Sequence, residues 1–219
     1  MYFARIAGGT FSMGMSDKER LALENRRNDH EAEFVDEFLK EVLPLVSPPI
    51  LVDVQTFLIA ESPIGHDFAK QHWTSLELID ADRVAYFTQL EELESILGRY
   101  GLQVPSESEW EFTYRSLNDF SSLPINFKLE FEPCDRLSGI GTYAEICADS
   151  WSDSIASMPL DGRARVGAKA RTIRGGAGQC YPWQGCGEWL MLMPFSRFSS
   201  EHLDYMSYSL RPAADIPQS

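Results

Sequence analysis

The segment Leu102–Arg115, which reads LQVPSESEWEFTYR, carries the clearest structural signal in the chain. Ser106 and Glu109 have the spacing of a capping box, in which each side chain accepts a hydrogen bond from a backbone N–H of the first helical turn. The spacing predicts a helix that starts at Ser106. Trp110 then lies on the inward face of that helix, where it would pack against the core.

The segment N-terminal to this helix alternates between strand-like and helical patterns. Residues 1–15 predict a strand, a turn at Gly8 and Gly9, and a second strand that ends at Gly14. Between Ser16 and Leu45 the chain is densely charged, and its apolar residues recur at helical spacing, which predicts an amphipathic helix that Pro44 and Pro48-Pro49 end. Ile50–Ile59 is typical of a strand because it is rich in β-branched residues.

A further helix is predicted to begin at Asp80 or Asp82 and to end near Leu97, because Gly98 is a frequent helix terminator. Its buried stripe would include Val84, Phe87, Leu90, Leu93 and Leu97. After Ser116 the pattern indicates turns and short strands, among them a strand that runs into a turn at Thr172–Gly176. These features predict an α+β fold that is rich in loops, with short strands and two or three helices.

Composition limits the classes of protein and partner to consider. The chain has 219 residues, 44% of them hydrophobic and 24% charged, which is ordinary for a globular protein and favours one domain. Its net charge of −14 would repel phosphate backbones, so nucleic acid is not an expected partner. The longest apolar runs, such as Leu190–Pro194, are far too short to span a membrane. Met1–Gly14 lacks the pattern of a signal peptide, so we expect a cytoplasmic protein.

Six segments, taken in order, resemble the formylglycine-generating enzyme family, also called sulfatase-modifying factor domains. Each segment is similar to one motif of that family, and together they extend over nearly the whole chain. The segments are Ile6–Gly14, Val54–Ile64, Leu102–Arg115, Gly141–Asp149, Arg174–Gly176 and Ser209–Arg211. The Leu102–Arg115 segment is the strongest match of the six.

The resemblance implies a C-type-lectin-like fold that forms a single domain over residues 1–219. A charged helical insertion at about 17–46 would replace a shorter loop of the family. The family includes copper-dependent oxidases that convert a peptide cysteine to formylglycine, iron-dependent oxygenases, and members without demonstrated chemistry. Fold alone therefore leaves the activity open.

The cysteines Cys180 and Cys186 are the candidate catalytic and metal-binding residues. In the family's oxidases, two cysteines after the Arg-Gly-Gly motif hold Cu(I), which soft thiolates select. Cys180 has the spacing of the first of these cysteines, and Cys186 lies one residue beyond the spacing of the second. The pair could equally form a redox-sensing dithiol or be two buried thiols in a loop.

Several residues of the family's site are replaced in this chain. Ala177 stands where a Ser is expected, Gly187 where an Arg is expected, and Ala144 and Ile146 where two Trp are expected. Thr142 replaces an Asn that helps to bind calcium in the family, which leaves Glu145 as the remaining candidate calcium ligand. The loss of several polar members at once argues against a preorganised catalytic site.

The departures favour a divergent binding or accessory module that faces a protein or peptide partner. Trp183, Trp189 and Arg174 are its candidate substrate-binding or partner-binding residues, because aromatic and Arg side chains carry much of the energy of interfaces. The alternative is a copper- or iron-dependent oxidase or oxygenase that uses O₂ and acts on a thiol or small molecule through Cys180 and Cys186. The sequence leaves open whether the protein is an enzyme.

Overall fold

A computed structural model gives the fold of the chain. It describes residues 1–25, 32–73, 85, 87, 90–117, 137, 140–141, 143–167, 169–176, 193–203 and 208–216. Within this part of the chain, the structure contains five α-helices: α1 (Asp17–Asn25), α2 (Ala32–Val46), α3 (His66–His72), α4 (Leu90–Gly98) and α5 (Glu107–Leu117). Two short 3₁₀ helices, η2 (Ile155–Ser157) and η3 (Ser200–Leu203), complete the helical elements described.

Eight short strands form three small antiparallel sheets over the described ranges. The strands are β1 (Phe3–Ile6), β2 (Gly9–Met13), β3 (Ile50–Val54), β4 (Phe57–Ala60), β5 (Ala144–Ser150), β6 (Arg171–Gly175), β7 (Arg197–Ser199) and β8 (Ala213–Asp215). The strand orders are β1-β4-β8, β2-β3 and β5-β6-β7. The predicted α+β class is confirmed, and the short strands follow the prediction.

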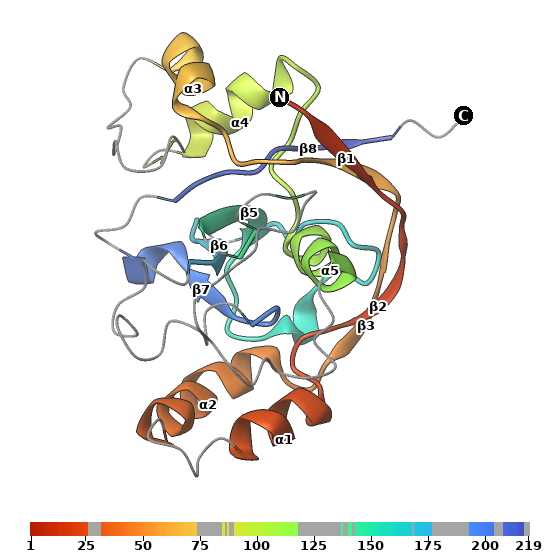
Figure 1. Cartoon of the computed structure of the whole chain (residues 1–219), viewed down its shortest axis with the longest axis vertical. Coiled ribbons are helices and arrows are strands. Elements are labelled where there is room, and N and C mark those ends of the chain that lie inside the picture. Colours follow the sequence, from red (N-terminus) through yellow and green to blue (C-terminus); the bar gives the residue numbers. More distant parts are fainter. Residues whose placement is uncertain are drawn as a thin grey trace.

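Helix α5 lies between the β2-β3 ribbon and the β5-β6-β7 sheet, near the middle of the molecule (Figure 1). Its inward face carries Trp110 and Tyr114, which belong to a buried cluster with residues of β2, β3, β4 and β5. Helices α1 and α2 lie at one end of the molecule and α3 and α4 at the other (Figure 1). The segment with the strongest sequence signal thus occupies the centre of the fold.

The charged segment that predicts one helix contains two, α1 and α2. Phe38 and Val42 of α2 are buried against Met193 and Phe195, as the apolar spacing predicts. Of the prolines predicted to end the helix, Pro44 lies inside α2, which continues to Val46 and ends before Pro48 and Pro49. Ser16 and Glu19 form a second capping box at the start of α1, which explains why the helix begins there.

Three other predicted elements need correction. Ile50–Ile59 is two strands, β3 and β4, which pair with different partners on either side of Gln55 and Thr56. Phe87 forms an isolated bridge with Tyr208 instead of lying in a helix, and α4 begins at Leu90. Helix α3 lacks a counterpart among the predicted elements, and with the division of the 17–45 helix it raises the count above the predicted two or three.

None of the helices in the described ranges is long and apolar enough to cross a bilayer.

Candidate functional site

The capping box that starts α5 has the geometry that the sequence predicts. The backbone N–H of Ser106 donates to Glu109 Oε2 at 2.7 Å, and the N–H of Glu109 donates to Ser106 Oγ at 3.0 Å. Ser106 Oγ also donates to the carbonyl of Gly162 at 2.7 Å, which ties the 161–164 loop to the helix. The first turn of α5 is therefore held both by its own capping box and by the 161–164 loop.

Glu107 is fully buried and forms an ion pair with Arg197. Its two carboxylate oxygens accept from Arg197 Nε at 2.6 Å and from Arg197 Nη2 at 2.9 Å. Arg174 Nη1 lies 3.5 Å from the same carboxylate. Burial alone would raise the pKa of Glu107, but the charges of Arg197 and Arg174 hold this pKa below its usual value. Glu107 is therefore a charged group inside the core.

Glu111, one turn further along α5, joins the end of β2 to the rest of the core. Its Oε1 accepts from the backbone N–H of Gly14 at 2.9 Å and from Arg115 Nε at 2.8 Å. Its Oε2 pairs with Arg174 Nη2. Arg174 Nη1 donates to the carbonyls of Phe195 and Ser196, and Nη2 donates to that of Pro194, so a single guanidinium links β6, α5 and the segment before β7.

Glu145 on β5 is the third buried carboxylate of this kind. Its Oε2 accepts from Trp110 Nε1 at 2.7 Å, and its Oε1 accepts from Arg211 Nη2 at 2.8 Å. Arg211 also donates to the carbonyl of Ala60. Since donors engage both oxygens, this carboxylate does not fit the donor set that calcium requires, and its role as a calcium ligand stays a prediction that the geometry disfavours.

Arg174 is likewise fully buried, and its described neighbours give it a structural role. Its predicted contact with a substrate or partner stays untested. Cys180, Cys186, Trp183 and Trp189 lie outside the described residues, so their predicted roles remain predictions. Cys147 is a buried free thiol, and burial raises its pKa.

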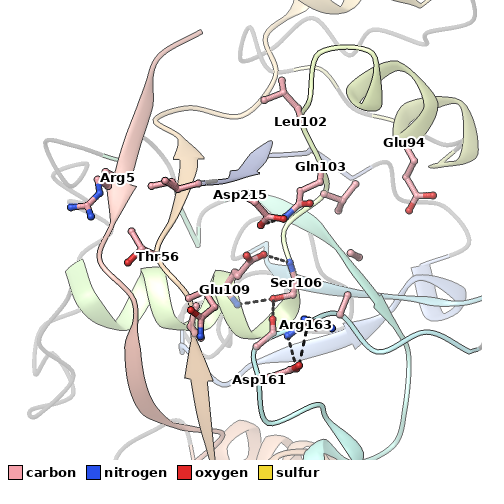
Figure 2. Close-up of a pocket in the computed structure, with 17 residues that line it drawn as sticks. Arg5, Thr56, Glu94, Leu102, Gln103, Ser106, Glu109, Asp161, Arg163 and Asp215 are labelled. Atoms are coloured by element: carbon pink, nitrogen blue, oxygen red, sulfur yellow. Dashed lines mark hydrogen bonds and ion pairs between the residues drawn. The ribbon is translucent and has the colours of Figure 1, made fainter. Parts of the chain in front are cut away.

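A cavity of about 820 Å³ opens beside the first turn of α5. Its walls come from β1, the ends of β3 and β8, the segment before α5 and the 161–164 loop. Figure 2 shows Glu109, Asp215, Gln103 and Ser106 near its centre, and Arg163 beside Asp161 below them. The volume lies within the ~300–1,000 Å³ that is usual for ligand sites.

The carboxyl groups of Glu109 and Asp215 both line this cavity, and the charge of Asp215 acts on the Glu109 carboxyl. Burial raises the pKa of Glu109 to about 7, and the nearby charges of Asp215 and Asp149 add to this effect, against the hydrogen bonds from Ser106. Burial and the charge of Glu107 also raise the pKa of Asp149, to about 6. A carboxyl group with a perturbed pKa at a cavity, as Glu109 is, is typical of functional sites.

The sequence pattern predicts only a helix-capping role for Glu109, and it predicts no functional role for Asp215, Gln103 or Arg197. Glu109 and Asp215 are 106 positions apart, and both line the cavity because β8 joins β4 and Gln103 bridges to Ala213. No local pattern around either residue predicts this proximity. Nowhere in the described ranges do three His, Cys, Asp or Glu side chains form a group that could hold a metal ion.

Two solved structures have a similar fold. The structure of PvdO from Pseudomonas aeruginosa has a TM-score of 0.62 and 14% sequence identity, and the match covers 98% of this chain and 94% of that one. Treponema denticola variable protein 1 has a TM-score of 0.61 and 13% identity, with 97% and 94% coverage. No family model and no curated protein matches the chain. The two structures support a formylglycine-generating-enzyme-like fold, as the sequence resemblance implies.

Proposed function

We propose that this chain is a divergent member of the C-type-lectin-like formylglycine-generating-enzyme fold that works as a cytoplasmic binding or accessory module. It would face a protein or peptide partner instead of acting as an oxidase. One observation carries the proposal: in the segments that resemble the family, charged residues form buried ion pairs with one another. Those pairs join Glu107 and Glu111 to Arg174, and Glu145 to Arg211.

Catalysis needs polar groups that meet the reacting atoms in an accessible site. The paired charges cannot supply them, because each is fully or almost fully buried. The sequence also has Ala177 and Gly187 where the family's oxidases have polar residues. The described part of the chain offers a ligand a cavity lined by both polar and apolar residues, which suits binding.

Helix α2 adds an acidic outer face that could contribute to docking. Glu33, Asp36, Glu37 and Glu41 are exposed there, with Lys40 as the accompanying basic residue. A face of this composition favours partners with basic groups and repels acidic ones. It agrees in sign with the net charge of the chain, −14.

The second candidate function is a metal-dependent oxidase or oxygenase that uses Cys180 and Cys186. The spacing of Cys180 after Arg174–Gly176 supports it, because β6 ends in the turn that would lead into such a site. Thiolates at these positions would hold copper, which would supply the oxygen chemistry when bound. The two functions make opposite predictions for copper.

An anaerobic Cu(I) titration against a competing chromophoric chelator tests the choice. We expect the wild type and Cys180→Ser to take up Cu(I) with the same affinity and stoichiometry, because a binding module has no dedicated copper site. Cys147→Ser is the matched control, since this thiol is buried. Tight one-to-one binding that Cys180→Ser abolishes and Cys147→Ser preserves would refute the binding proposal and favour the oxidase.

A further inference from the structure

The cavity beside α5 is lined by two carboxylates, and in each of them one oxygen accepts a hydrogen bond from a described residue. Glu109 Oε2 accepts from the backbone of Ser106, and Asp215 Oδ1 accepts from Gln103 Nε2 at 3.2 Å. Among the described residues, no donor reaches Glu109 Oε1 or Asp215 Oδ2. The hydrogen bonds that do form hold each carboxyl group in place, so the two remaining oxygens are fixed acceptors at the cavity.

The other charges around the cavity are mostly neutralised locally. Arg163 pairs with Asp161 at 3.3 Å within the same loop, and Glu94 pairs with Arg171 at 3.0 Å. Arg5 lines the cavity from β1 and lies to one side of the central carboxylates (Figure 2). Above the pKa of Glu109, which burial raises to about 7, the centre therefore carries two negative charges, which a cationic group would offset.

Apolar side chains line the same cavity beside the carboxylates. They are Val54, Leu102, Val104, Ala148, Ala164 and Ile216. Such a wall fits the methylene stem of an amphipathic cation, as surfaces that hold lysine stems do. Calcium fits poorly, because two carboxylates fall short of the six to eight oxygens that this ion takes.

We propose that this cavity binds a primary alkylammonium group, with Glu109 and Asp215 as its acceptors and the apolar wall around its methylene chain. The group would come from a lysine side chain of a peptide or from a free amine. The inference rests on the proposed function as a binding module and names the chemistry of its ligand. The ammonium group has three donors, enough for both carboxylates and one further acceptor.

Calorimetric titrations of the full chain at pH 8 test the inference with three probes. N-acetyl-lysine methylamide and 1,5-diaminopentane present the ammonium group as a peptide side chain and as a free amine, and N-acetyl-norleucine methylamide lacks it. The variants are Glu109→Gln, whose amide can still cap the helix, and Asp215→Asn. Glu37→Gln, exposed on α2, is the matched control for loss of one negative charge.

We expect the lysine probe to bind and the norleucine probe to fail. Each cavity variant should weaken lysine binding at least tenfold, and Glu37→Gln should leave it unchanged. Binding of the diamine as well would identify a free amine as a second source, whereas its failure would identify the peptide side chain. The inference is overturned if no amine binds at millimolar concentration, or if both cavity variants bind as the wild type does.

These failures are distinct from failure of the proposed function. If lysine peptides bind equally to the wild type and to both cavity variants, the proposed binding function stands and only the assignment of this site is refuted. If no amine binds and the chain has a copper site that depends on Cys180, both the proposed function and the inference are refuted.

Discussion

Replacing Glu107 with Gln should lower the free energy of unfolding by about 3–5 kcal/mol, the cost of removing one partner of a buried ion pair. The Gln side chain has nearly the same shape, so the core keeps its packing. Arg197 and Arg174 would lose the carboxylate that faces them. Both guanidinium groups are fully buried, and water cannot replace the missing charge. Urea denaturation followed by circular dichroism measures the change.

Glu94→Gln is the matched control for Glu107→Gln. It removes the same charge from a partly exposed pair with Arg171, and solvent screening limits the expected loss to about 1 kcal/mol or less. The double variant Glu107→Gln/Arg197→Met should be more stable than Glu107→Gln alone, because an apolar side chain replaces the uncompensated charge. Equal stability of Glu107→Gln and Glu94→Gln would contradict the structural role assigned to the buried pairs.

Gly175→Ala should lower the free energy of unfolding by about 2–5 kcal/mol, the combined cost of backbone strain and overpacking. Gly175 ends β6 at a φ of +73°, a conformation that side chains with a Cβ seldom adopt. An added Cβ would lie 2.5 Å from the carbonyl oxygen of Tyr143 and 2.9 Å from that of Gly141. Both contacts are with backbone, so the β5-β6 pairing itself would have to shift.

Gly98→Ala provides the control for Gly175→Ala, because a Cβ at Gly98 meets nothing within 4 Å. This substitution at the end of α4 should leave stability unchanged or raise it by up to about 1 kcal/mol, since Ala favours helices more than Gly does. Thermal unfolding of the two variants separates local strain from a general effect of replacing glycine. A Gly175→Ala protein as stable as Gly98→Ala would show that the turn after β6 can relax.

Local patterns in the sequence predicted much of the centre of the fold. The capping box of Ser106 and Glu109, the inward Trp110 and the strand before Gly175 depend on near neighbours, and the structure confirms each. The short helix α3 was missed because seven residues give too little periodicity to detect. Of the three prolines predicted to end the helix, Pro44 lies inside α2, because tertiary packing of α2 against Met193 and Phe195 outweighs the local cost of a proline.

The candidate site was harder to predict because its residues come from distant parts of the chain. Arg197 meets Glu107 across 90 positions, and nothing near either residue indicates the partner. The sequence pattern predicts a site at Cys180 and Cys186, whose spacing resembles that of the copper-binding cysteines of the family's oxidases. Both residues lie outside the described residues. Glu109 was assigned to its local cap, while its second role depends on the distant Asp215 of β8.

A cationic group bound at the Glu109–Asp215 cavity would lie beside the Glu109 carboxyl. The charge of Asp215 on β8, that of Asp149 on β5 and the capping bonds from Ser106 act on the Glu109 carboxyl. A bound ammonium group would favour the ionised carboxylate and so lower the pKa of Glu109. Binding of the ligand and titration of this one carboxyl group are therefore linked.

The most direct test is a carbon NMR titration of Glu109 Cδ, identified by its absence from the Glu109→Gln spectrum, with and without saturating N-acetyl-lysine methylamide. We expect the titration of Glu109 to have its midpoint near pH 7 in the free protein, because burial raises the pKa of Glu109 to about 7. The midpoint should fall when the lysine probe is bound. A midpoint near the usual 4.5 that the probe leaves unchanged would contradict binding of a cationic group at this cavity.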